Sequence, residues 1–365
     1  MELAQSQAEL PSKSMIDSYE AAVIPLKSDK ELRGKYVNSF NLVRYGRIME
    51  DLDTMAVWIS FSHNRTNGAE REYRSPLSFV TAMVDSIDIM PEALIPSQDI
   101  TICGHVTWVG STSVEVSMHV EQVQNGAIIP AVAAKFVMVA RDPQKNRKAF
   151  VCPLEMHTDE EKSLFDAAAC RKAIRQTEAE ESLLRIPPSH DERLLIHDLF
   201  LQTLDESSAT FKHPIKPAGS VWMEDTLLKN ITICFPEERN LYGKIFGGYL
   251  MRQAFEIAWA NACVYCKGRP SIVAVDDIIF KKPVEIGSLL YLSSQIVYTN
   301  GDHMLVKVHA EVVNAKSGQH ETTNIFHYTF RSKMTIPPVI PKSYAEYMMY
   351  LDGKRHFGVK PDEKQ

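Results

Sequence analysis

An asparagine, two glycines and an apolar run stand at a spacing that can support chemistry on a carbonyl group. Asn240 lies seven residues before Gly247 and Gly248, which open a run of helical length reaching about Cys266. Glycines at a helix N-terminus leave backbone N–H groups uncovered, and these donors, with the helix dipole, favour developing negative charge. The pattern predicts a corner that holds an oxyanion, with Asn240 orienting a water or a carbonyl beside it. The same glycine pair is also common where it only permits close packing.

Composition and charge limit the class of protein. The chain has 365 residues, 45% hydrophobic and 24% charged, which is typical of a soluble globular protein with two domains. A net charge of −6 gives no global basic field for nucleic acid, and no apolar run approaches the roughly 20 residues of a membrane span. The first 30 residues mix acids with lysines and hold no arginine, unlike a secretory signal or an ordinary transit peptide.

The cysteines favour a reducing compartment. Six in so long a chain make no disulfide framework. Cys263 and Cys266 form a CxxC inside the apolar helical run, with no second pair nearby, so we interpret them as packing thiols and expect no metal site there.

The chain looks like a sequence written twice. Residues 99–111 can be laid over 276–288, since each stretch begins with an Asp and reaches a Gly-Ser at the same offset. Alternating patterns rich in β-branched and aromatic residues follow in both copies and predict antiparallel strands with one buried face. These patterns occupy 113–121 and 133–140 in the first copy, and 290–298, 304–312 and 323–330 in the second.

One helix precedes each strand set in this interpretation. We predict helices at about 76–90, with Pro76 in the first turn, and at about 248–266, each with an extra strand before it at 57–62 and 229–235. Each half is then α+β, a long helix wrapped by a curled antiparallel sheet. The predicted limits are an N-terminal extension 1–37, a first domain 38–152, a helical linker 153–217, a second domain 218–335 and a C-terminal tail 336–365.

Five strings give the chain a family resemblance: VRYGRIMEDLD (43–53), GHVTWVGSTS (104–113), KIFGG (244–248), VAVDDIIFKKPVEIGS (273–288) and YLDGKRHF (350–357). Together they resemble the mitochondrial double-hotdog acyl-CoA thioesterases over about residues 38–357. The resemblance implies a tandem hotdog fold and hydrolysis of fatty acyl-CoA to fatty acid and CoA, with no cofactor beyond the CoA of the substrate. It further implies a mitochondrial location and a homo-oligomer, such as a trimer of double hotdogs. A cytoplasmic location is the alternative, because no convincing transit peptide is present.

The resemblance also implies how the site is composed. In the family a loop asparagine of one hotdog meets a helix carboxylate of the other, nine positions after the residue that precedes Gly-Gly. Counting from Phe246 reaches Phe255, which cannot act as a base. We therefore expect the carboxylate in the first half, at Asp85, with Asp88 as the fallback. The symmetry-related counterpart is expected to be inactive, because Glu70 falls where its asparagine would lie and Pro76-Leu-Ser replaces the glycine pair.

Thioester hydrolysis assigns a role to each candidate. Asp85 would be the general base or, as a second route, the nucleophile, and Asn240 would position the water. The N–H of Gly247 or Gly248 would hold the oxyanion. Lys281, Lys282 and Arg331 are candidates for the CoA phosphates, although cations at strand edges also serve solubility.

Other functions were weighed against hydrolysis. A non-catalytic regulatory protein that binds acyl-CoA or CoA would show saturation without release of thiol. A hydratase would need an Asp and a His at short spacing near a helix start, and no such pair is found. No cysteine has a helix N-terminus and a histidine near it in sequence, which disfavours a thiol nucleophile.

Overall fold

The computed structural model divides the chain into two compact units that do not coincide with the two sequence halves. It describes residues 3–65, 77–90, 93–142, 144, 147–205, 214–240, 242–314 and 317–358. The first unit comprises Met1–Ala173, Cys234–Gln253 and Asp277–Ser288, and the second comprises Ile174–Ile233, Ala254–Asp276 and Leu289–Gln365. The start of the second-half helix therefore belongs to the same unit as the first-half helix.

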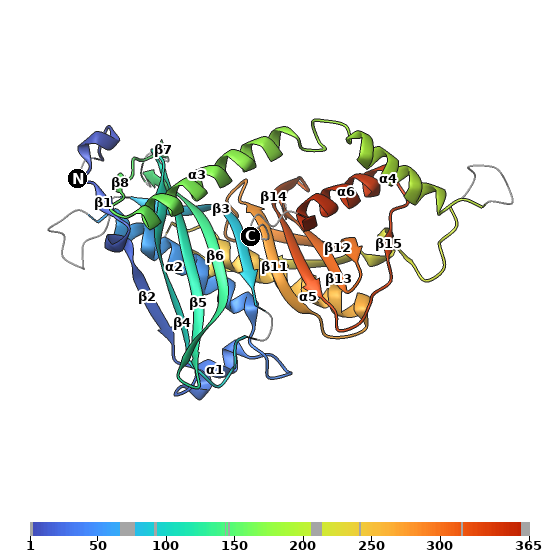
Figure 1. Cartoon of the computed structure of the whole chain (residues 1–365), viewed down its shortest axis with the longest axis horizontal. Coiled ribbons are helices and arrows are strands. Elements are labelled where there is room, and N and C mark those ends of the chain that lie inside the picture. The colour runs from blue at the N-terminus through green and yellow to red at the C-terminus, as the bar shows by residue number, and fades with distance from the viewer. Residues whose placement is uncertain are drawn as a thin grey trace. The chain divides into compact units, whose positions relative to one another are not determined.

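The first unit is built on an antiparallel sheet with strand order β2-β4-β5-β6-β3 (Figure 1). These strands are Glu20–Ile24, Ile100–Val109, Ser113–Gln124, Ala127–Asp142 and Ser78–Ile89, in that order, and the short β7 (Arg147–Lys148) pairs with β6. A parallel pair joins β1 (Lys13–Ser14) to β8 (Leu154–Glu155). The unit also holds the short 3-10 turns η1 (Gln7–Glu9), η2 (Ile16–Ser18) and η4 (Pro236–Glu238), with helices α1 (Lys30–Tyr36) and α2 (Tyr45–His63).

Helix α2 packs on the sheet through one apolar stripe. Ile48, Leu52, Ala56 and Ile59 are buried and recur at spacings of three and four, as a helix face requires. The predicted strand at 57–62 is therefore wrong, because this stretch forms the last turns of α2. Its β-branched and aromatic residues suit a strand locally, but burial of the stripe against the sheet outweighs that preference.

The predicted helix at 76–90 is also wrong. Residues Ser78–Ile89 form strand β3, which pairs antiparallel with β6. The register shifts between Thr81 and Met83 and again between Val84 and Ser86. Each bulge breaks the period-two alternation, so the sequence loses the pattern that marks a strand. Pro76 and Glu70, which entered the prediction, lie outside the described residues.

The second unit repeats the topology, with strand order β10-β12-β13-β14-β11. These strands are Leu228–Ile233, Leu289–Asn300, His303–Val313, His320–Arg331 and Ser271–Ile279, in that order. Most of helix α5 (Gly247–Cys266) belongs to this unit, where Phe255 packs against Tyr328 and Phe330 of β14. The predicted helix at 248–266 and the predicted strand at 229–235 are thus confirmed within a residue or two.

The second unit carries further elements around its sheet. Helix α6 (Tyr344–Gly358) contacts β12, β13 and β14. Two charged helices follow the first strand set in the chain, α3 (Asp159–Glu180) and α4 (His190–Leu201), within the range predicted as a helical linker. The remaining pieces are η3 (Met223–Thr226) and a parallel pair of β9 (Val221–Trp222) with β15 (Val339–Ile340). None of the described helices is long and apolar enough to span a bilayer.

A matched hydrogen bond gives the true register of the repeat. The hydroxyl of Ser18 accepts the N–H of Val106 on β4 at 2.9 Å, and the hydroxyl of Thr226 accepts the N–H of Ile296 on β12 at 3.0 Å. The equivalent strands are therefore β4 and β12. The predicted overlay of 99–111 on 276–288 is wrong, because Gly110 follows β4 whereas Gly287 precedes β12.

The chain is a tandem of two hotdog-type α+β repeats, as predicted. The domain limits stay predictions. Strand β2 nevertheless shows that the segment before residue 38 supplies an edge strand to the first sheet.

Candidate active site

Asp53 is the carboxylate that meets the glycine corner. Its side chain is 1% exposed, on the ninth residue of α2. One carboxylate oxygen accepts the N–H of Gly248 at 2.6 Å, and the other accepts the hydroxyl of Thr81 on β3 at 2.5 Å. All three residues belong to the first unit. The start of α5 thus donates a backbone N–H directly to an acid of α2.

The surroundings of Asp53 place its titration near neutrality. Burial raises the pKa of this carboxyl to about 6, and the charge of Glu50 adds to the rise, against the lowering effect of the hydrogen bonds from Thr81 and Gly248. A general base works best when its pKa is close to the operating pH, so this environment suits proton abstraction from water.

The two glycines are needed because α5 approaches α2 closely. A Cβ on Gly248 would lie 2.8 Å from the Cα of Glu50, a backbone atom that cannot rotate away. A Cβ on Gly247 would lie 3.0 Å from the Oδ2 atom of Asp53 and 3.2 Å from the ring of Phe280. Only glycine, which has no Cβ, leaves room for the carboxylate to contact the N-terminus of the helix.

Asn240 forms a tight loop just before α5. Its Oδ1 accepts the N–H of Tyr242 at 2.9 Å and that of Lys244 at 3.1 Å, and its own N–H donates to the carbonyl of Lys244 at 2.7 Å. Gly243 makes the turn with φ of +73°. With Oδ1 occupied, the amide orientation is set and Nδ2 is the atom left to contact a substrate.

Two donors remain at this corner. Within the described part of the chain, the Nδ2 group of Asn240 and the N–H of Gly247 make no hydrogen bond. Gly247 is partly exposed, whereas Gly248 is buried and already donates to Asp53. The start of α5 therefore has one backbone donor, and the preceding loop one side-chain donor, without a hydrogen bond among the described residues.

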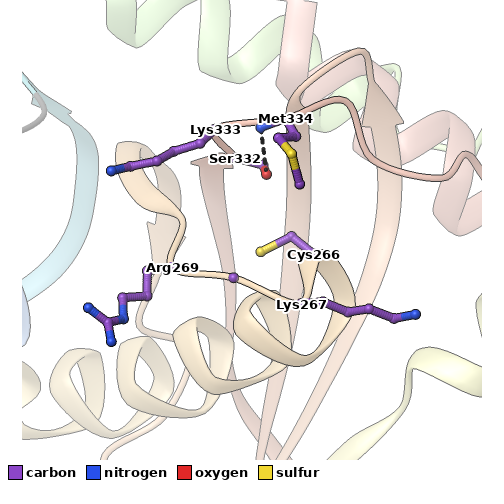
Figure 2. A pocket seen from close by; sticks show the side chains of 7 residues that line it. Cys266, Lys267, Arg269, Ser332, Lys333 and Met334 are labelled. Carbon is purple, nitrogen blue, oxygen red and sulfur yellow. Dashed lines mark hydrogen bonds between the residues drawn. The ribbon is translucent and has the colours of Figure 1, made fainter.

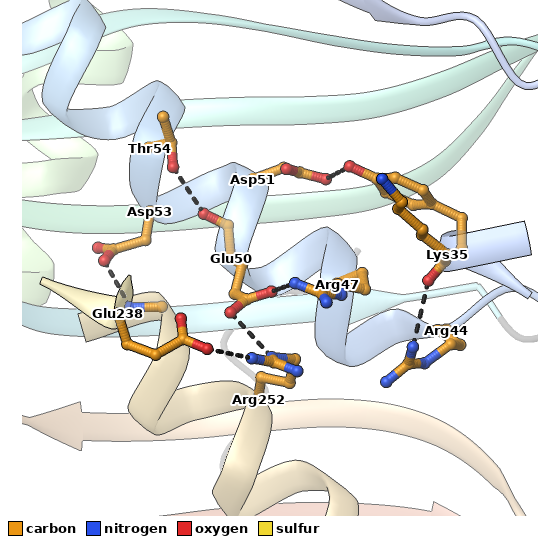
Figure 3. A network of polar contacts seen from close by, with 11 residues as sticks. Lys35, Arg44, Arg47, Glu50, Asp51, Asp53, Thr54, Glu238 and Arg252 are labelled. Atoms are coloured by element: carbon orange, nitrogen blue, oxygen red, sulfur yellow. Dashed lines mark hydrogen bonds and ion pairs between the residues drawn. The ribbon is translucent and has the colours of Figure 1, made fainter. Parts of the chain in front are cut away.

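An ion-pair network links the two helices beside Asp53, as Figure 3 shows. Glu50 of α2 bonds Arg47 at 2.7 Å and Arg252 of α5 at 2.8 Å, and Arg252 reaches Glu238 at 3.3 Å. Glu50 and Arg252 are each the sixth residue of their helix. The side chains of Glu50 and Arg252 are only 13% and 10% exposed, so this ion pair is largely removed from water.

A second buried acid lies two residues before Asp53. Asp51, labelled in Figure 3, accepts a hydrogen bond from the hydroxyl of Tyr36 at 2.7 Å. Burial raises its pKa to about 6 as well. Unlike Asp53, it has a tyrosine of α1 as its partner and not the start of α5.

The predicted carboxylates lie elsewhere. Asp85 and Asp88 are on strand β3 and not on a helix, so the structural premise of that prediction is wrong. Asp85 pairs with Arg171 of α3 at 3.4 Å, and the same guanidinium bonds Glu115 at 2.5 Å. Asp88 is paired in register with Ala133 of β6. The structure brings Gly247 and Gly248 to Asp53 instead.

A usable signal for Asp53 was present in the sequence. Helix α2 begins at Tyr45, and Asp53 lies nine positions after the preceding residue, Arg44. In α5 the same offset leads from Phe246 to Phe255. Recognising α2 as the first-half helix would have identified Asp53. Phe255, at the equivalent position of α5, is 8% exposed and packs on aromatic side chains in the second unit.

The proposed phosphate cations divide between the units. Lys281 and Lys282 are exposed and directly follow Phe280, whose N–H donates to the carbonyl of Ala82 on β3 at 3.0 Å. Phe280 also lies against Gly247, so both lysines follow a residue of the corner. Arg331 belongs to the second unit and bonds Asp302 at 2.9 Å.

A separate pocket of about 220 Å³ lies in the second unit, lined by Cys266, Lys267, Gly268, Arg269, Ser332, Lys333 and Met334. Figure 2 shows the side chains of Arg269 and Lys333 directed to the same side and that of Lys267 directed to the other.

Burial raises the pKa of Cys263 to about 11, which keeps the first thiol of the CxxC protonated and poorly nucleophilic.

Comparison with known proteins identifies the family of the chain. The thioesterase superfamily profile matches residues 242–319. The mitochondrial acyl-coenzyme A thioesterase 9 of Homo sapiens is 49% identical over 97% of this chain and 80% of its own length. The mitochondrial acyl-coenzyme A thioesterase 4 of Humulus lupulus is 34% identical over 95% of this chain and 67% of its own length.

Among solved structures, a putative oleoyl thioesterase from Lactobacillus plantarum aligns with a TM-score of 0.48 at 10% identity, covering 87% of this chain and 96% of that one. The sequence relatives are sufficient for the assignment. This chain belongs to the hotdog acyl-coenzyme A thioesterase family.

Proposed function

We propose that the chain hydrolyses fatty acyl-CoA to a free fatty acid and CoA, at a composite site made by Asp53, Asn240 and the start of α5. Membership of the family makes the chain a thioester hydrolase, and a non-catalytic binding role has no support from its relatives. The observation that carries the site is the 2.6 Å bond from the N–H of Gly248 to the buried carboxylate of Asp53.

The reaction follows from the donors and acceptors of the corner. Asp53 removes a proton from a water, and the water oxygen forms a bond to the thioester carbonyl carbon. The carbonyl oxygen becomes an oxyanion, which the N–H of Gly247 and the Nδ2 group of Asn240 stabilise. The C–S bond then breaks, and the CoA thiolate leaves and takes up the proton held by Asp53.

The contacts of Asp53 favour a base over a nucleophile. Each of its oxygens already accepts one hydrogen bond, from Thr81 or from Gly248. These bonds hold the carboxylate in one orientation and reduce the electron density available for attack on carbon. Each oxygen still has a second lone pair that can accept the proton of a water.

The CoA moiety requires cations near the corner. Lys281 and Lys282 are the proposed contacts for its phosphates, because they follow Phe280 beside Gly247 in the same unit. Lys244 is engaged by Glu285 in an ion pair. Arg331 is a weaker candidate, since Asp302 already occupies its guanidinium in the second unit. No cofactor takes part in the proposed reaction.

Location and assembly are proposed from the relatives. Relatives at 48–49% identity carry mitochondrial names, which supports a mitochondrial site of action. One structural neighbour is described as a hexameric acyl-CoA thioesterase, and a homo-oligomer of tandem hotdogs, such as a trimer, is proposed here.

The test is release of free thiol from acyl-CoA by the purified full chain. Wild-type protein is expected to release thiol in proportion to time, and the Asp53→Asn variant to lose the activity while keeping its circular dichroism spectrum. Activity of Asp53→Asn close to wild type would remove Asp53 from the reaction. In a single turnover in ¹⁸O-labelled water, base catalysis places the label in the fatty acid and leaves Asp53 unlabelled, and label found in Asp53 would show that it attacks as a nucleophile.

A further inference from the structure

Two histidines and an aspartate meet in the second unit, between β14 and α6. His327 lies on β14, and Asp352 and His356 lie on α6, the helix that crosses beside that strand in Figure 1. One ligand atom from each residue lies within 4.8 Å of the others. Asp352 and His356 are four positions apart, so they project from one face of the helix.

His327 is buried without a hydrogen bond. It is 4% exposed, and among the described residues neither Nδ1 nor Nε2 has a hydrogen-bond partner. Its neighbours on β14, Phe326 and Tyr328, are fully buried, and Tyr328 faces Phe255 of α5. Alternation along the strand directs His327 to the opposite face, where α6 lies. An imidazole buried in this way loses its hydrogen bonds with water, and only a further group that binds its nitrogens restores them.

His356 is oriented as a metal-binding histidine would be. Its Nδ1 is 3.0 Å from a carboxylate oxygen of Asp276 on β11, which fixes the tautomer with the proton on Nδ1. Its Nε2 then faces Asp352 at 3.8 Å, and the Nε2 of His327 faces the other oxygen of Asp352 at 3.8 Å. The two rings stack with centroids 4.1 Å apart.

We propose that His327, Asp352 and His356 form a binding site for a divalent transition metal ion of the zinc class. Two imidazole nitrogens and one carboxylate oxygen suit zinc, with a water as the fourth ligand. Ligand atoms about 2.0–2.2 Å from zinc in a tetrahedron stand roughly 3.3–3.5 Å apart. The three candidate ligand atoms lie within 4.8 Å of one another, so the side chains must approach by up to about 1.5 Å to bind the ion. The ion would hold α6 against β14.

Lys307 of β13 competes with the proposed metal ion for the carboxylate of Asp352. Its ammonium bonds Asp352 at 2.8 Å. A bound cation must share Asp352 with this ammonium, so removing the ammonium should tighten metal binding.

The experiment titrates Zn²⁺ alone into the chelator-treated full chain, followed by calorimetry and by thermal unfolding. One equivalent per chain is expected, with a rise in Tm. His356→Gln and Asp352→Asn should weaken binding by at least about tenfold, and Asp276→Asn by about 10- to 100-fold. His303→Gln is the matched control, since this histidine of the same unit pairs with Asp302 outside the cluster, and it should bind as wild type does.

Lys307→Met decides between a metal site and a purely electrostatic latch. A metal site predicts tighter Zn²⁺ binding in this variant, even where the apo chain loses stability. Wild-type affinity equal to that of His356→Gln, or Zn²⁺ binding that Lys307→Met weakens, would overturn the proposal. The readouts are affinity and Tm, so they are independent of thioester hydrolysis.

Discussion

The N–H of Gly248 and the carboxylate of Asp53 are 195 residues apart in the chain and 2.6 Å apart in space. Neither sequence half contains both groups. The bond joins a helix N-terminus, where positive charge gathers, to a buried acid that the same positive charge helps to ionise. In the proposed reaction, this corner supplies the base and leaves the adjacent N–H of Gly247 to meet the substrate.

Asp53→Asn should reduce kcat by about 10²- to 10⁴-fold, because the amide cannot accept the proton of the water. The matched control is Asp51→Asn, which removes a second buried acid of similar pKa on the same helix. It should keep most of the activity, since Asp51 bonds Tyr36. Initial rates of thiol release check both, and equal losses in the two variants would mean that the effect is structural.

Asn240→Asp separates the two functions of the loop amide. The new carboxylate can still accept the N–H groups of Tyr242 and Lys244, so the turn should persist. It lacks the Nδ2 donor, and kcat should fall by about 10²- to 10³-fold. Asn240→Ala loses the acceptor as well and should also lower Tm. If Asn240→Asp kept full activity over pH 7–9, the amide donor would have no part in the reaction.

Gly248→Ala should destabilise the chain by about 1–3 kcal/mol, because its Cβ meets the backbone of Glu50 at 2.8 Å and must displace α2. The loss of register should also lower kcat. Gly34→Ala on α1 is the control, since no atom lies within 4 Å of a Cβ there, and alanine should be tolerated or slightly stabilising. Chemical denaturation of the two variants provides the comparison.

The pH profile of kcat/KM should fall on the acid side with an apparent pKa of about 6, since only ionised Asp53 can act as a base. The free energy of unfolding changes with pH in the opposite direction to kcat/KM. A carboxyl whose pKa is raised on folding binds more protons in the folded state between about pH 4 and 6, so its contribution to unfolding free energy declines as pH rises through that window.

That linkage gives a second readout on Asp53→Asn. A shift from 3.8 to about 6 corresponds to roughly 3 kcal/mol at most. At pH 8 the variant should therefore be as stable as wild type or more stable, while inactive. A variant that is both inactive and markedly less stable at pH 8 would argue that Asp53 serves the fold.

The Glu50–Arg252 pair should show strong coupling. Replacing either residue by alanine leaves a partner charge largely buried, with an expected cost of about 3 kcal/mol, and the double variant should cost much less than the sum. A thermodynamic cycle by urea unfolding measures the coupling. Additive losses would show that Arg47 and Glu238 satisfy the remaining charges without this pair.

The sequence predicts the second half well and the first half poorly, for physical reasons. Helix α5 begins at a glycine pair and runs apolar for its whole length, so local pattern and fold agree. In the first half the α2 residues 57–62 have strand preferences, and β3 has two bulges that erase its alternation. The secondary structure of both segments depends on burial against residues distant in sequence, and local propensity does not contain that information.

The same reason decides which candidates of the proposed site follow from the sequence. Asn240, Gly247 and Gly248 follow from it because one short motif contains all three, and their roles stay predictions. Asp53 does not follow from the sequence in this way, because the strand preferences at residues 57–62 hide the helix that holds it, although it stands at the offset from its helix start that the family resemblance implies. Asp85 was chosen in its place from an apolar run that forms a strand.

Opposite charges at equivalent helix positions also govern which copies can assemble. In a twofold pairing of identical first halves, Glu50 would face another glutamate, and identical second halves would set Arg252 against another arginine. Like charges that are removed from water repel strongly, so pairing of two identical repeats is disfavoured relative to pairing of a first repeat with a second repeat. Fusion within one polypeptide then supplies the two complementary helices in equal numbers.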